Sequence, residues 1–293
     1  MRKPNLFIVG APKSGTTAMD QYLGRHPEIF MADRKESHFF GRDLTARYGR
    51  PTKAEYLSYF SLAGKEKRVG ESSVFYLFSK EAGSEIKAFS PEAKIIIMLR
   101  NPVDMMYSLH AYKIYHATED IEDFSAALKA EEDRKKGLRI PPSTQFVESL
   151  YYRQLGRYSE QVKRYLDVFG RENMHVIIFD DFKTDTPGEY RRTLAFLGVD
   201  PDFAPEFEII NPTGMARSKL IQRLANFTLA RSYMLRQIIP QSLRSIVRRL
   251  NTIQKGPAPM AAELRRQLQA EFAPEVERLS ELLGRDLTCW TAG

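Results

Sequence analysis

Two features are nearly absent from this sequence of 293 residues: cysteine and long hydrophobic runs. The single cysteine, Cys289, excludes an internal disulfide and a cysteine-rich metal site. No stretch approaches the roughly 18 apolar residues that a membrane span requires. The apolar run that follows the first residues is too short for the core of a signal peptide. We therefore expect a cytoplasmic protein.

Short apolar runs alternate with segments of helical spacing along most of the chain. The run from Lys94 to Leu99 is apolar without alternation, which is typical of a parallel strand covered on both faces. The order of elements predicts an α/β, P-loop-like three-layer fold with a central, mostly parallel sheet. We expect a single domain over residues 1–293, an exposed loop at 131–139 and a basic helical C-terminal region at about 212–293. Strands are predicted at 5–9, 29–32, 69–75, 94–99 and 174–179, and helices at 15–24, 102–116, 151–169 and 189–197.

Residues 10–17, with the sequence Gly-Ala-Pro-Lys-Ser-Gly-Thr-Thr, join the first predicted strand to the first predicted helix. A loop of backbone N–H groups that leads into a helix N-terminus forms an anion site. The spacing from Gly10 to Gly15 matches a nucleotide phosphate loop, but Thr16 stands where the lysine of that loop is expected. The lysine lies upstream instead, as Lys13. A lysine there could neutralise a leaving phosphate without a metal, so we predict no metal site.

Two motifs in this order resemble the sulfotransferase family. Residues 12–17 resemble the family's 5′-phosphosulfate loop, and residues 99–108 resemble its 3′-phosphate motif. The resemblance implies transfer of a sulfuryl group from 3′-phosphoadenosine 5′-phosphosulfate (PAPS) to an acceptor hydroxyl or amine, with adenosine 3′,5′-bisphosphate (PAP) as the product. It implies that the donor is bound by Lys13, Ser14, Gly15, Thr16, Thr17, Arg100 and Ser108.

Residues 35–40, Lys-Glu-Ser-His-Phe-Phe, resemble a segment of the sulfotransferases that act on glycosaminoglycans, in which the glutamate is the catalytic base. The acceptor must lose a proton as it attacks sulfur, so a carboxylate or an imidazole is needed nearby. We expect Glu36 to be the base, with His38 as its partner or as the alternative base. The glycosaminoglycan enzymes carry Glu-Lys-Ser/Thr where this chain has Glu-Ser-Ser at 71–73, which leaves the acceptor open between a glycan, a lipid and a small molecule.

The stretch between Glu208 and Glu263 contains no acidic residue, whereas nine lysines and arginines lie between 217 and 255. Three interpretations stay open: a solvated helical face, attraction of an anionic acceptor, and peripheral contact of 217–255 with an anionic membrane. No motif indicates nucleic-acid binding. Residues 211–218 resemble the late loop with which bacterial family members close over the nucleotide, which implies that Arg217 contacts a phosphate.

Two other functions remain as alternatives. The first is a magnesium-dependent P-loop phosphoryl transferase, such as a nucleotide or small-molecule kinase. The displaced lysine and the presence of Arg100, where such enzymes require a carboxylate, argue against it. The second is a non-catalytic nucleotide-binding scaffold, in which Glu36 and His38 would have no chemical role. The lone tryptophan, Trp290, is predicted to pack the last helix onto the domain.

Overall fold

The centre of the fold is a five-stranded sheet in which every neighbouring pair of strands is parallel, in the order β2-β3-β1-β4-β5. The computed structural model describes residues 2–208, 215–216, 252–253 and 258–292. Each strand overlaps a predicted apolar run, although β1 extends one residue further, to Gly10, and β3 runs from Arg68 only to Ser72, before the predicted end at Phe75. The strands are β1 (Leu6–Gly10), β2 (Ile29–Met31), β3 (Arg68–Ser72), β4 (Lys94–Leu99) and β5 (Met174–Ile178).

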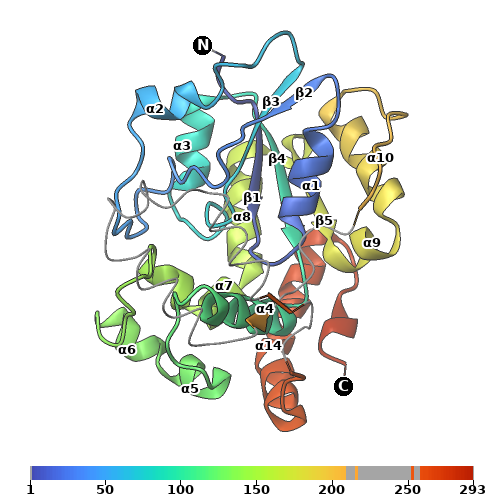
Figure 1. The fold of residues 1–293 in the computed structure, drawn as a ribbon. Coiled ribbons are helices and arrows are strands. Elements are labelled where there is room, and N and C mark those ends of the chain that lie inside the picture. The colour runs from blue at the N-terminus through green and yellow to red at the C-terminus, as the bar shows by residue number, and fades with distance from the viewer. Residues whose placement is uncertain (1, 209–214, 217–251, 254–257, 293) are drawn as a thin grey trace.

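Helices cover both faces of the sheet (Figure 1). Side chains along β1 alternate between the two faces. Leu6 and Ile8 belong to a core with side chains of α1, α9 and α10, and Phe7 and Val9 belong to a larger core with side chains of α3, α4, α8 and α14. The three-layer α/β prediction is confirmed. The described helices are α1 (Thr16–Leu23), α2 (Lys53–Ser58), α3 (Ala82–Phe89), α4 (Pro102–Tyr115), α5 (Phe124–Lys129), α6 (Glu131–Lys135), α7 (Tyr152–Leu155), α8 (Tyr158–Phe169), α9 (Phe179–Thr184), α10 (Thr186–Leu197) and α14 (Ala262–Leu283).

The segment 131–139 is not the exposed loop that its charged composition predicts, because it begins as helix α6. Arg134 is fully buried, and its Nη2 donates a hydrogen bond of 2.7 Å to Oε1 of Glu119. The hydroxyl of Tyr152 donates to the other oxygen of that carboxylate at 2.9 Å. A buried charge is tolerated only with such partners, and these partners lie outside the segment whose composition suggested a loop.

The predicted helix at 151–169 is two helices, α7 and α8, because the chain turns at Gly156 and Arg157. A Cβ atom at Gly156 would lie only 2.9 Å from Cε1 of Phe272, which belongs to α14. The side chain of Phe272 thus approaches the backbone so closely at this point that a larger residue than glycine would have to displace it. This contact with a distant part of the chain is what the local helical pattern could not show.

The C-terminal part contains strand as well as helix. Met215–Ala216 (β6) and Thr252–Ile253 (β7) form an antiparallel pair, so the prediction of a purely helical region after residue 211 is wrong at these residues. Trp290 is buried, and its Nε1 donates to Oδ2 of Asp180 on α9 at 3.0 Å, which gives it the packing role that was predicted. Among the described helices, none combines the length and the hydrophobicity of a membrane span.

Candidate active site

The residues predicted to carry chemistry follow strands of the same sheet. The phosphate loop follows β1, Glu36 lies shortly after β2, and Arg100 directly follows β4. Because these strands are parallel, their carboxyl ends meet at one edge, which is where open α/β sheets bind ligands. The topology therefore brings together motifs that are up to 87 residues apart in the sequence.

The phosphate loop makes a tight turn into α1. Lys13 and Gly15 both have a positive φ, of 59° and 87°. A Cβ atom on Gly15 would also lie 3.1 Å from Cδ2 of Phe179, so this position favours glycine for two reasons. Ser14 is buried and its hydroxyl donates to the carbonyl of Pro12 at 3.3 Å. Among the described residues no side chain caps α1, whose first residue is Thr16, so the N–H groups of its first turn are available to an anion.

Two cations meet at this loop. Nη1 of Arg100 donates to the carbonyl of Lys13 at 3.5 Å, and the guanidinium lies 5.0 Å from the ring centre of Phe179. Nζ of Lys13 lies 4.6 Å from the ring centre of Tyr112. Burial, together with the charge of Arg100, lowers the pKa of Lys13. Within the described part of the chain neither cation forms an ion pair, so together they provide an uncompensated positive site that an anion would stabilise.

The structure places the other residues that were predicted to bind the sulfuryl donor in different surroundings. Thr17 lies on α1 and lines the pocket described below. Ser108 is half-buried on α4, two helical turns beyond Arg100, and its hydroxyl has no hydrogen bond to the residues that the structure describes. Arg217 and nearly all of the basic segment 217–255 lie outside the described residues.

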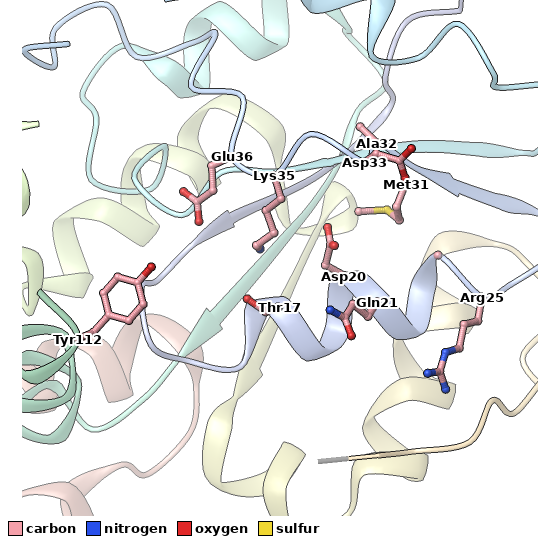
Figure 2. A pocket seen from close by; sticks show the side chains of 11 residues that line it. Thr17, Asp20, Gln21, Arg25, Met31, Ala32, Asp33, Lys35, Glu36 and Tyr112 are labelled. Carbon is pink, nitrogen blue, oxygen red and sulfur yellow. The ribbon is translucent and has the colours of Figure 1, made fainter. Parts of the chain in front are cut away.

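A pocket of about 720 Å³ opens between α1 and the segment that follows β2. In Figure 2 the side chains of Asp20, Lys35 and Glu36 extend toward the same space, whereas Arg25 points away from it. The guanidinium of Arg25 is bonded elsewhere, to the carbonyl of Glu206 at 2.6 Å. The pocket is lined by Thr17, Asp20, Gln21, Gly24, Arg25, Met31, Ala32, Asp33, Lys35, Glu36 and Tyr112.

Glu36 lines this pocket, and His38 lies beside Glu36. Oε2 of Glu36 accepts a hydrogen bond from the N–H of Val74 at 3.0 Å and lies 3.7 Å from Nε2 of His38. Burial raises the pKa of Glu36, and the nearby charge of Lys35 opposes the shift. Burial, reinforced by Arg50 and other cations, lowers the pKa of His38 to about 4. At neutral pH the imidazole is therefore uncharged, and Glu36 is the stronger base of the two.

The sequence interpretation missed two residues of the pocket. Nζ of Lys35 donates to Oγ of Ser72 at 2.5 Å, which places a cation beside the serine that departs from the glycosaminoglycan pattern. Burial raises the pKa of Asp20 to about 6, while the charge of Lys35 opposes the shift. Asp20 lies three residues after Thr17, so the helical period puts both on one face of α1. The spacing between Thr17 and Asp20 in the sequence could therefore have indicated that Asp20 belongs to the site.

A parallel sheet with a phosphate loop after its central strand and a second cationic motif after the adjacent strand defines a P-loop-like α/β nucleotide-binding class. The sequence matches the model of the sulfotransferase domain family over residues 3–212. The chain belongs to that family.

The chain is also similar to individual sulfotransferases. It is 33% identical to a solved sulfotransferase from Alicyclobacillus acidocaldarius, with a TM-score of 0.76 and 100% of both chains covered. It is 26% identical to human heparan sulfate glucosamine 3-O-sulfotransferase 5, with 68% of this chain and 54% of that protein covered. It is 25% identical to mouse carbohydrate sulfotransferase 15, with 68% and 44% covered. The chain thus spans about half the length of these two curated relatives.

Proposed function

We propose that this chain transfers a sulfuryl group from PAPS to an acceptor hydroxyl or amine. The observation that carries the proposal is the contact between Arg100 and the carbonyl of Lys13, which joins the two predicted phosphate motifs at one edge of the sheet. Two separate cations beside a free helix N-terminus suit a donor with two separate phosphates. Membership of the sulfotransferase family supports the same reaction.

In this proposal the residues that bind the sulfuryl donor contact different parts of it. The loop residues 13–17 hold the 5′-phosphosulfate, and Lys13 stabilises the negative charge that builds up on the leaving phosphate. Arg100 and Ser108 bind the 3′-phosphate. Arg217 would add a further phosphate contact from the late loop. No metal is assigned to the reaction, because the cations of the chain itself take the charge of the phosphates.

Glu36 is proposed as the acceptor base. The acceptor oxygen or nitrogen forms a bond to sulfur while the bond between sulfur and the phosphate oxygen breaks, and the acceptor proton moves to the Glu36 carboxylate. Its raised pKa makes it a better proton acceptor than an ordinary glutamate. His38 is proposed as its uncharged neighbour, 3.7 Å away, which limits where the carboxylate can turn.

The acceptor is proposed at the class level only. The names of two curated relatives refer to carbohydrate or to heparan sulfate, so glycans are the first acceptors to test. The basic segment 217–255 would attract an anionic glycan or an anionic membrane surface. We further propose that residues 1–293 act as one sulfotransferase domain.

Calorimetry with PAP and with ATP, each with magnesium and with a chelator, tests the proposal. We expect PAP to bind far more tightly than ATP, with the same affinity in magnesium and in chelator. Preferential, magnesium-dependent binding of ATP would instead support a phosphoryl transferase. Tight PAP binding with no sulfate transfer to pooled glycans, lipids and phenols would support a non-catalytic scaffold.

A further inference from the structure

A buried carboxylate lies directly behind the segment that carries Glu36. Glu71, on β3, is 1% exposed. Its Oε1 accepts hydrogen bonds from the hydroxyls of Ser73, at 2.9 Å, and Tyr76, at 2.7 Å, and from the hydroxyl of Ser37. Its Oε2 accepts a hydrogen bond from the hydroxyl of Tyr56. A buried carboxylate is costly unless it is satisfied in this way.

Two of these hydroxyls, those of Ser73 and Tyr76, lie outside the segment 36–40 and also accept hydrogen bonds from its backbone. The N–H groups of Ser37 and His38 donate to Oγ of Ser73, at 3.1 and 3.3 Å. The N–H group of Phe40 donates to the hydroxyl of Tyr76 at 3.2 Å. A hydroxyl has one proton to donate and two lone pairs. Because each of these hydroxyls gives its proton to Glu71, its lone pairs are directed at the N–H groups of the segment.

We propose that Glu71 is a positioning residue for the acceptor base: through Ser73 and Tyr76 it holds the backbone of residues 37–40, directly after Glu36, in the orientation that presents the carboxylate to the pocket. This proposal rests on the proposed role of Glu36. The residue touches neither the pocket nor the donor loop, since neither is among its hydrogen-bond partners and it does not line the pocket.

The electrostatics of the site support the same link. Burial is the main reason for the raised pKa of Glu36. The charge of Lys35 and the hydrogen bond from the N–H of Val74 oppose this shift, and the charges of Glu71 and Asp20 add to it. His38, the other neighbouring titratable group, is uncharged at neutral pH. Removal of the charge of Glu71 should therefore lower the pKa of Glu36.

Glu71→Gln is the variant that tests the proposal. It keeps the volume of the side chain, but its NH2 group is a donor facing hydroxyls that also donate. We expect turnover of 35S-labelled PAPS with pooled glycans and phenols to fall tenfold or more, while the Kd for PAP stays within threefold. We also expect the 13C carboxyl signal of Glu36, assigned by its loss in Glu36→Gln, to titrate at lower pH. Ser73→Ala keeps the charge of Glu71 and should leave that midpoint near its parent value, so a fall in its turnover reports positioning separately from charge.

Three further variants separate positioning from general destabilisation. Ser73→Ala removes a relay hydroxyl and should reduce turnover like Glu71→Gln, so it carries the test if Glu71→Gln fails to fold. Tyr56→Phe removes a hydroxyl that contacts Glu71 but not the segment, and it should keep turnover within threefold. Glu131→Gln changes another buried glutamate, which accepts a hydrogen bond from the N–H of Arg153 and does not line the pocket, and it controls for lost stability.

The outcomes distinguish this inference from the proposed function. Turnover within twofold of the parent protein in both Glu71→Gln and Ser73→Ala would overturn the positioning role. Normal turnover in Glu36→Gln would instead overturn the assignment of the base, and the titration of Glu36 would still report whether Glu71 acts on it. Loss of PAP binding in Glu71→Gln would also contradict the proposal, because it would place the effect at the donor site.

Discussion

Replacing Glu36 by glutamine is expected to remove most of the turnover and to leave the site intact. Oε2 of Glu36 accepts the hydrogen bond from Val74 N–H, whereas Oε1 has no hydrogen-bond partner among the described residues. The amide oxygen of glutamine can keep the bond to Val74, and its NH2 group then takes the place of Oε1. The variant loses the ability to accept a proton and little else.

The size of the effect follows from the chemistry of the base. General base catalysis contributes about 10²–10⁴-fold to a rate, so turnover should fall by that factor. Lys13 and Arg100, the cations proposed to bind PAPS, belong to other segments. The affinity of Glu36→Gln for PAP should therefore stay within a few-fold of the parent value. His38 has a pKa of about 4 and is a weak base, so His38→Asn should cost less than tenfold.

The pH dependence gives a second measure of the same residue. Burial raises the pKa of Glu36, and only the deprotonated form accepts a proton. The kcat/KM of the parent protein should therefore rise with pH through a midpoint above the ordinary value for glutamate, and this rise should disappear in Glu36→Gln.

The assay is sulfate transfer from 35S-labelled PAPS, with PAP calorimetry and the Tm of each variant measured beside it. A large loss in His38→Asn together with near-normal turnover in Glu36→Gln would reverse the assignment of the base. Little loss in either variant, both with unchanged Tm, would place the base elsewhere and refute the reasoning.

Three other changes test the donor site, the buried ion pair and the charge in the pocket. Arg100→Ala should weaken PAP binding about tenfold or more in calorimetry, since hydrogen bonds to charged groups contribute roughly 1.5–3 kcal/mol, and Ser108→Ala should weaken it in the same direction. Both variants should leave the binding of adenosine 5′-phosphosulfate, which lacks the 3′-phosphate, nearly unchanged. Equal losses of affinity for both nucleotides would mean that Arg100 is structural. Glu119→Gln should lower the free energy of unfolding in urea by about 3–5 kcal/mol, because it leaves the fully buried Arg134 without a counter-charge. Asp20 binds its proton more tightly in the folded chain, where its pKa is about 6, than in the unfolded chain, so the parent protein should lose stability as pH rises from about 4 to about 6. The Tm advantage of Asp20→Asn should grow across that window, and a constant difference would contradict the raised pKa.

Local patterns in the sequence determined the strands, the phosphate loop and the family. The apolar runs around β1 and β4 need no distant partner to be recognised, because strands buried on both faces are apolar throughout. The loop that contains Lys13 and the motif that contains Arg100 are contiguous, and each follows such a strand. The meeting of the two motifs then follows from the parallel sheet.

The tertiary structure alone decided which side chains are buried together. Phe272 packs against Gly156 at the break between α7 and α8, and the buried Arg134 donates a hydrogen bond to the buried Glu119. The same holds at the site, where Asp20 and Lys35 line one pocket and Glu71 lies behind Glu36. Burial and the arrangement of charges set the pKa values of these groups, and both depend on contacts between residues far apart in the chain, which no local pattern encodes.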